Sequence, residues 1–299
     1  MEQLELLKRK IESTRDLQSV VKTMKSLAAV NIREYERSVE SLEKYSKNIE
    51  MGLQILMRAR DEDFLNVRPL KENNGSLGVI IFGSVQGMVG QFNDQIATFA
   101  YRKIDEFEIN QENLYVLAVG ERIKDLLEAR GHIIDNFISL FESLRDLVSF
   151  NQMVLLKVEE WRLDHEVGRL ILFHNKPAQK TTFQPSMDHL LPLDLDWLTG
   201  LAEKEWPSRV LPTHSMGWDR LFSSLIRQYF FVSIYRATVE SLASENASRL
   251  ASMQAAEKNI EEKLEEINNR YMQQRQRSIT SELLDIISGF EVLSDENNL

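Results

Sequence analysis

The last third of the chain contains a run without glycine or proline, from Trp218 to Ser288, which Gly217 and Gly289 bracket. Glycine and proline destabilise a helix interior most, so a run of this length is typical of one continuous α-helix. At about 1.5 Å per residue, its ~71 residues predict a rod of roughly 105 Å, whereas an average helix has ~11–12 residues. Because most helical stability comes from packing an apolar face, such a rod requires a partner along its length.

The first sixty residues provide that partner. Only Gly52 interrupts them. Positions that alternate in steps of three and four residues are Leu4, Leu7, Ile11, Thr14, Gln18, Val21, Lys25, Ala28, Ile32, Tyr35, Val39, Leu42, Ser46, Ile49, Leu53 and Leu56. Twelve of these sixteen are apolar or alanine, a repeat typical of a left-handed coiled coil, and the C-terminal run shows the same spacing more loosely. The two terminal helices are therefore expected to pack together, antiparallel if a compact domain between them returns the chain.

The middle of the chain carries the signals of that compact domain. All six prolines lie between Pro69 and Pro212, and residues 61–75 are expected to be a linker. Strands are predicted at 77–82, 114–119, 132–137 and 169–174, helices at 91–107, 121–130 and 142–160, an extended segment at 181–191 and a turn-rich return at 200–213. This alternation predicts a parallel α/β sheet.

The predicted fold class is thus a mixed one. We expect a long antiparallel coiled coil of N- and C-terminal helices with an inserted Rossmann-like α/β domain. The expected domains are an N-terminal helix at 1–60, the α/β domain at 61–212 and a C-terminal helix at 213–299.

Composition excludes several function classes. The net charge of −10 argues against nucleic acid as the main partner. The chain has no cysteine, which excludes disulfide and thiol chemistry and fits a cytosolic protein. No run of ~18 apolar residues predicts a transmembrane helix, and the first residues lack the features of a signal peptide.

No segment indicates catalysis. The loop Gly83–Gly90 follows a strand and precedes a helix, where a phosphate loop would lie, but it has no lysine and matches neither the Walker nor the Rossmann pattern. A structural turn is favoured there. Asp164, His165 and Glu166 match no metal-ligand spacing, and a solvated loop is favoured. The sequence predicts no catalytic residue, cofactor or metal site, and the chain is not expected to be an enzyme.

Polar residues within the helices are more informative. Thr14, Gln18 and Lys25 occupy core positions of the first heptads, where buried polar groups fix register in coiled coils. The alternative is that they face solvent where the helices diverge. Residues 275–282 are polar on several faces of the second helix. Simple solvation explains this as well as enclosure by a partner protein does.

Three blocks resemble the gamma subunit, or central stalk, of F-type ATP synthases, and the resemblance covers nearly the whole chain. The N-terminal block comprises residues 8–14 and 20–29, and the most specific segment runs from Glu245 to Asn259. A last block comprises Arg275-Gln276, Ser278-Ile279-Thr280, Glu282-Leu283 and 286–289.

The resemblance implies a rotating shaft that couples ion translocation in a membrane sector to ATP synthesis or hydrolysis in a ring of three alpha and three beta subunits. It also implies an epsilon subunit and a membrane c-ring as partners. The chain would be peripheral, at the cytoplasmic face of a bacterial or archaeal plasma membrane. By position in the motifs, Met24 and Lys25 would face a moving segment of a beta subunit. The other contacts to alpha and beta loops would be Arg249, Gln276, Thr280 and Glu282.

The chain departs from the family pattern at two places. Val85-Gln86-Gly87-Met88-Val89-Gly90 replaces the usual Asp-Arg-Gly-Leu-Cys-Gly, and Phe290 replaces a small residue. With its strong acidity, the chain is similar to the alternative, sodium-pumping F-type complexes of some bacteria and archaea.

Two other function classes stay open. A coiled-coil adaptor or scaffold with an α/β head would bind partners without carrying torque, and such adaptors are commonly homodimers. An α/β enzyme with helical arms would bind a nucleotide by itself.

Overall fold

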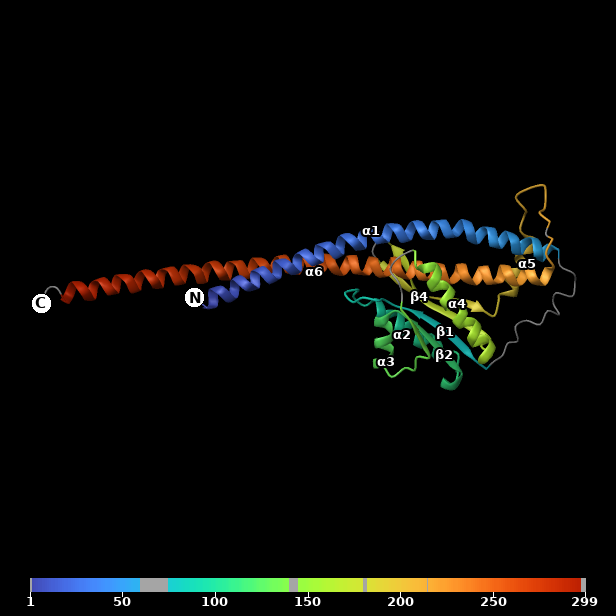
Figure 1. The fold of residues 1–299 in the computed structure, drawn as a ribbon, viewed down its shortest axis with the longest axis horizontal. Helices are drawn as coiled ribbons and strands as arrows, with labels where there is room; N and C mark the ends of the chain where they lie inside the picture. Colours follow the sequence, from blue (N-terminus) through green and yellow to red (C-terminus); the bar gives the residue numbers. More distant parts are fainter. Residues whose placement is uncertain (1, 60–74, 140–144, 180–181, 214, 297–299) are drawn as a thin grey trace. The chain divides into compact units, whose positions relative to one another are not determined.

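The computed structural model describes residues 2–59, 75–139, 145–179, 182–213 and 215–296 (Figure 1). Its elements, in chain order, are α1 (Glu2–Arg58), β1 (Leu77–Phe82), α2 (Phe92–Asp105), the short 3₁₀ helix η2 (Gln111–Asn113), β2 (Leu114–Val119), α3 (Glu121–Ala129), β3 (Asn136–Ile138), α4 (Leu147–Asp164), β4 (Arg169–Gln179), β5 (Thr182–Leu191), α5 (Leu195–Glu203) and α6 (Trp218–Glu296). The chain divides into a first unit, Met1–Leu27 with Leu250–Leu299, and a second unit, Ala28–Arg249. Most of the expected linker lies outside the described residues.

Burial along α1 follows the heptad repeat. Each of the sixteen positions from Leu4 to Leu56 is buried or partly buried, whereas most positions between them are exposed as far as Asn48. The polar members Thr14, Gln18 and Lys25 are partly buried like their apolar neighbours. The prediction of one apolar face along the whole helix is therefore confirmed.

Contacts between α1 and α6 give an antiparallel pairing. In the second unit the contacts are Asn31 with Asn246, Tyr45 with Gln228, and the Leu56 carbonyl with the Trp218 indole. In the first unit, Val21 packs against Met253 and Ile260. Residue numbers fall along α6 as they rise along α1 within the second unit, as the predicted fold requires.

Helix α6 runs past the stretch without glycine or proline that indicated it. That stretch ends at Ser288, and the helix continues through Gly289 to Glu296. Glycine costs a helix interior about 1 kcal/mol relative to alanine, which weakens the helix without stopping it.

The sheet of the second unit has five strands in the order β3-β2-β1-β4-β5. Strands β1 to β4 are parallel to one another, but β5 is antiparallel to β4. The expectation of a wholly parallel sheet is therefore wrong at this edge. Gln179 and Thr182 are only three positions apart, and a connection that short cannot make the crossover that parallel strands need.

Two apolar clusters cover the two faces of the sheet. On one face, Val79 and Ile81 of β1 pack with residues of α2 and α3. On the other face, Ile80 and Phe82 pack with residues of α4 and with the second-unit parts of α1 and α6. Alternate residues of one strand thus face opposite layers, as a doubly covered sheet requires.

Three smaller elements differ from the sequence prediction. The third strand and the helix α4 each lie about four residues later than expected, and α5 was not predicted. The side chain of Asp194 caps α5 by accepting a hydrogen bond from the Trp197 amide at 2.9 Å. Among the described residues, no helix combines the length and apolarity needed to cross a membrane.

Candidate partner-contact surface on the long helices

Three predicted contact residues lie on the last part of α6 and are exposed. They are Gln276, Thr280 and Glu282. The Thr280 hydroxyl donates to the Gln276 carbonyl at 2.9 Å, and the Ser278 hydroxyl donates to Glu282 Oε1 at 3.4 Å. These bonds stay within the helix, so the side chains of Gln276 and Glu282 keep capacity to bind an external partner.

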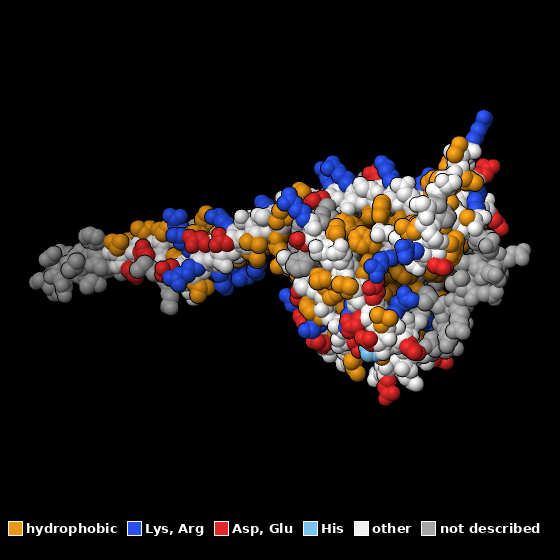
Figure 2. Space-filling view, turned by 45° about the vertical axis from the view of Figure 1, so that its right-hand side comes forward, with side chains coloured by type: hydrophobic (Ala, Val, Ile, Leu, Met, Phe, Trp, Pro, Cys, Tyr) orange, Lys and Arg blue, Asp and Glu red, His pale blue; other side chains and the backbone are white. Residues whose placement is uncertain are grey.

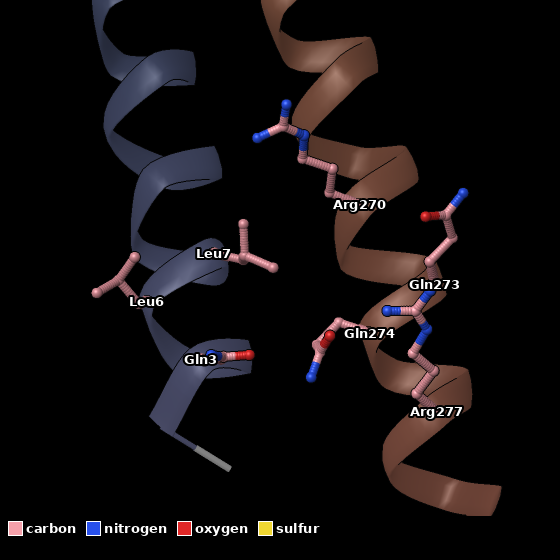
Figure 3. Close-up of a pocket in the computed structure, with 7 residues that line it drawn as sticks. All are labelled: Gln3, Leu6, Leu7, Arg270, Gln273, Gln274 and Arg277. Atoms are coloured by element: carbon pink, nitrogen blue, oxygen red, sulfur yellow. The ribbon is translucent and has the colours of Figure 1, made fainter.

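Beside this segment, an open groove of about 450 Å³ separates the start of α1 from α6 (Figure 3). Gln3 and Leu7 of α1 and Gln274 of α6 extend into the space between the helices, while Leu6 points away from α6. The groove therefore separates the two helices at this end, and the polar core positions Thr14, Gln18 and Lys25 are not among the residues that line it.

Near this groove, ion pairs form along α6 itself. Glu266 pairs with Lys263 and Arg270, each at 2.6 Å. The hydrogen bond from Lys263, reinforced by the charge of Arg270, lowers the pKa of Glu266. Figure 2 shows Lys and Arg side chains interspersed with Asp and Glu along this helical part. Such mixed-sign faces are typical of solvated coiled-coil flanks.

Large apolar side chains are exposed on the same segment of α6. Ile279, Leu283, Leu284, Ile286 and Ile287 are each about half exposed, between 48% and 58%. On α1, Leu17, Val20 and Leu27 are exposed to a similar extent. Apolar surface of this kind indicates a protein-binding region.

Met24 and Lys25 lie where α1 packs on α6 in the first unit. Met24 packs against the cluster of Val21, Met253 and Ile260. The Lys25 ammonium pairs with a carboxylate oxygen of Glu257, and both side chains are partly buried. Lys25 is thus engaged within the chain, on a side of α1 that is only partly accessible.

Arg249 differs from the other predicted contact residues because it is buried. Its side chain is 7% exposed and pairs with Glu245, which is 2% exposed, at 2.6 Å. The Arg249 Nε has no hydrogen-bond partner among the described residues. Arg249 therefore does not lie on the surface of the second unit.

The loop Gly83–Gly90 is held by internal hydrogen bonds. The Ser84 amide donates to Asn93 Oδ1 at 2.9 Å, and Asn93 Nδ2 donates to the Ser84 hydroxyl at 2.8 Å. The Arg122 amide donates to the Ser84 carbonyl at 3.0 Å. These bonds are those of a structural turn.

The other candidate of the sequence, Asp164-His165-Glu166, begins at the last residue of α4. The His165 ring stacks on Tyr115 with 4.5 Å between ring centroids. Among the described residues, no group of three or more His, Cys, Asp or Glu side chains could hold a metal ion.

Sequence reasoning missed one set of polar residues on α6. Glu240, Ser244 and Ser248 contact the α/β part of the second unit through their side chains. Their spacing of four residues, within a run of small side chains, is a signal that a search for polar helix faces could have found.

Comparison with known proteins places the chain among relatives of one kind. The family model described as ATP synthase matches residues 3–293. The chain is 28% identical to the ATP synthase gamma chain of Sulfurovum sp. (strain NBC37-1), over 97% of this chain and 99% of the relative. It is 26% identical to the corresponding chain of Geotalea uraniireducens (strain Rf4), with the same coverage.

Solved structures show the same fold. The Euglena gracilis mitochondrial ATP synthase (OSCP/F1/c-ring, rotational state 3) contains a chain with a TM-score of 0.65 and 16% identity, covering 100% of this chain and 97% of that one. The central stalk and c-ring structure of the Tetrahymena thermophila mitochondrial ATP synthase gives a TM-score of 0.55 and 17% identity, over 79% of this chain and 99% of the other.

Proposed function

Because this chain belongs to the ATP synthase family as a gamma chain, the non-catalytic central rotor stalk of the F-type enzyme, we propose that it couples ion translocation to ATP synthesis or hydrolysis by rotating within a catalytic ring. The ring would consist of alpha and beta subunits. The α/β domain would lie near an epsilon subunit and a membrane c-ring. The chain would be peripheral, at the cytoplasmic face of the membrane.

The observation that carries this proposal is the exposed apolar surface of α6 in the first unit. Helix α6 continues to Glu296, beyond Arg277, which lines the groove together with Gln3 of α1. In this last part of α6, the large apolar side chains from Ile279 to Ile287 are about half exposed. A single helix gains most of its stability from packing, so this segment requires a surrounding protein. A sleeve formed by the ring would supply it.

Six residues are proposed to contact that ring: Met24, Lys25, Arg249, Gln276, Thr280 and Glu282. The exposure of the last three supports direct contact with alpha and beta loops. Lys25 would exchange between Glu257 and a moving segment of a beta subunit as the shaft turns. Arg249 would reach the ring only by leaving Glu245, so its contribution would depend on local rearrangement.

The proposed division into domains matches the proposed rotary function. Residues 1–60 and 213–299 would form the shaft, and residues 61–212 would form the part that attaches to the rotor in the membrane.

The chain is further proposed to belong to the sodium-pumping subgroup of F-type complexes. The divergent loop Val85–Gly90, the bulky Phe290 and the acidity of the chain support membership of the sodium-pumping subgroup. Vesicles that contain the purified complex should accumulate Na⁺ on ATP addition in the presence of a protonophore. Uptake that the protonophore abolishes would assign proton coupling instead.

Direct observation of rotation tests whether the chain acts as a rotating shaft. A probe attached to the α/β domain of a complex reconstituted with alpha and beta subunits from the same host should turn in three steps per revolution when ATP is added. Hydrolysis by such a complex without any rotation of the probe would contradict the proposal.

A further inference from the structure

The strand order of the sheet reverses between β1 and β4. In the order β3-β2-β1-β4-β5, the chain moves outward from β1 to β3 and then returns to the other side of β1. Ligands of open α/β sheets bind in the crevice at the carboxyl ends of the two strands flanking such a reversal. Here that position lies just after Phe82 of β1 and at His174 and Asn175 of β4.

Helix α6 occupies this position with three side chains spaced four residues apart. Glu240 Oε2 lies 3.0 Å from His174 Nε2. The Ser244 hydroxyl donates to the Asn175 carbonyl at 3.0 Å, and the Ser248 hydroxyl donates to the Val89 carbonyl at 2.6 Å. A spacing of four residues places all three on one face of the helix, which we name the coupling face.

The coupling face is shielded from water. His174 and Ser244 are fully buried, and the Glu240 side chain is 15% exposed. All residues from Ser241 to Arg249 are buried, so α6 is enclosed on every side for more than two turns. Hydrogen bonds in such surroundings are costly to leave unmade.

Charges beside the coupling face come from the sheet. Asp188 Oδ2 of β5 lies 3.9 Å from the same His174 nitrogen that contacts Glu240. Lys176 of β4 binds that Asp188 at 2.9 Å. Glu240 therefore interacts with a network that extends across both strands, and not with an isolated histidine.

We propose that the coupling face of α6 fixes the rotational position of the helix about its own axis against the α/β domain, and thereby transmits torque between them. This inference rests on the proposed rotary function. Apolar burial is non-directional, whereas hydrogen bonds depend on angle, so the three polar contacts resist rotation of α6 in a way that apolar packing alone does not. The crevice that binds a ligand in other open α/β sheets holds the shaft helix here.

The test compares buried serines on one helix. In the double variant Ser244→Ala, Ser248→Ala, two hydroxyls that bond the α/β domain are lost. The matched control is Ser241→Ala, because Ser241 is 1% exposed and its hydroxyl has no hydrogen-bond partner among the described residues. Each complex is reconstituted into vesicles, and ions pumped per ATP hydrolysed are measured against an increasing opposing ion gradient.

We expect the double variant to hydrolyse ATP and to pump normally without a gradient. Against a gradient that the wild type still pumps, its ratio of ions to ATP should fall at least twofold, because the helix slips under load. The Ser241→Ala complex should follow the wild type. A folding defect alone would lower hydrolysis and pumping together at every gradient.

A double variant with the same load dependence as Ser241→Ala would overturn the inference while leaving the rotary function intact. If the double variant does not assemble, Ser244→Ala alone is measured, with a smaller loss expected under load and restoration by Ser244→Thr, which keeps a hydroxyl. A wild-type complex that hydrolyses ATP without pumping would instead overturn the proposed function, and the inference with it.

Discussion

Lys25 of α1 and Glu257 of α6 form an ion pair across 232 positions of sequence. Their side chains are 33% and 16% exposed, so the pair is only partly screened by solvent. Lys22 lies 4.0 Å from the same glutamate and is 54% exposed. The polar residue at a heptad core position is therefore matched by an opposite charge on the partner helix, which specifies how the two helices align.

This pair should contribute measurably to helix packing. A double-mutant cycle of Lys25→Ala and Glu257→Ala, measured by urea unfolding, should give a coupling free energy of about 0.5–1 kcal/mol that declines at high salt. The same cycle with Lys22→Ala should give a smaller value, because Lys22 is more exposed. Equal coupling for both lysines would mean that the geometry of the Lys25 contact has no energetic consequence.

Substitution within the buried pair of Glu245 and Arg249 should lower the free energy of unfolding more than substitution of Lys25 or Glu257. Arg249→Ala removes the guanidinium that pairs with the buried Glu245 carboxylate, so it should lower the free energy of unfolding by roughly 3 kcal/mol. The double variant Glu245→Ala, Arg249→Ala should lose less than the sum of the two single variants. The exposed i,i+4 pair Lys258–Glu262 is the control, and Lys258→Ala should cost under about 0.5 kcal/mol. Strict additivity at Glu245 and Arg249 would contradict this account.

Two glycines should respond to alanine in opposite directions. A Cβ at Gly83 would overlap the Ile123 side chain at its Cβ, so Gly83→Ala should destabilise the second unit by about 1–3 kcal/mol. Gly200 lies in α5, where such a Cβ would meet no atom of the described residues within 4 Å apart from its neighbours and the backbone of its own helix, and Gly200→Ala should stabilise by about 0.5–1 kcal/mol. Thermal unfolding of both variants checks the signs. A stable Gly83→Ala protein would mean that α3 can move away from the sheet.

Mild acidification should lower the free energy of unfolding, because His132 binds a proton less readily in the folded chain than in the unfolded one. Burial lowers the pKa of His132 below 6.5, and the charge of Arg130 adds to this effect, against a smaller opposing effect of Asp105. Between the lowered pKa and 6.5, the unfolded chain binds more protons than the folded one, so stability rises with pH there and is fully present above 6.5. The difference in unfolding free energy between the wild type and His132→Gln should therefore shrink as pH falls from about 7.5 to about 5.5. A difference that does not vary with pH would contradict a lowered pKa of His132 in the folded chain.

The exposed contact residues should affect activity without affecting stability. Gln276→Ala, Thr280→Ala and Glu282→Ala should each change the unfolding free energy of the chain by under about 0.5 kcal/mol, since all three side chains are exposed. Combined, they should lower ATP hydrolysis by the assembled complex at least fivefold, because even one lost contact of about 1 kcal/mol is worth roughly fivefold. Glu261→Ala, also exposed on α6, serves as the control. A triple variant as active as the control would remove these residues from the proposed interface.

Periodic features of this fold could be predicted from the sequence, while features set by tertiary contacts could not. The heptads from Leu4 to Leu56 specify the buried face of α1 because coiled-coil packing repeats at fixed intervals. Strand β2 was predicted with its observed bounds because both its faces are apolar. The direction of β5 depends on a short hairpin connection, which periodicity does not report.

The same distinction applies to the candidate surface, where some features could be predicted from the sequence and others could not. The exposure of Gln276 and Thr280 follows from a polar helix segment, and the sequence indicated that segment. The burial of Arg249 follows from its contact with Glu245, one turn earlier, inside a helix that other elements enclose. Enclosure depends on the packing of α1 and the sheet around α6, and a polar sequence gives no sign of it. For the same reason, the contacts of Glu240, Ser244 and Ser248 became visible only in the structure.

Subunit stoichiometry tests the central claim most directly. Native mass spectrometry of the complex that copurifies with the tagged chain from its own host should give one copy of this chain with three alpha and three beta subunits, and the same sample should hydrolyse ATP. A single asymmetric shaft can serve a threefold ring only at that ratio. A homodimer of this chain, or a binary complex without alpha and beta subunits, would contradict the rotary account and favour a coiled-coil adaptor.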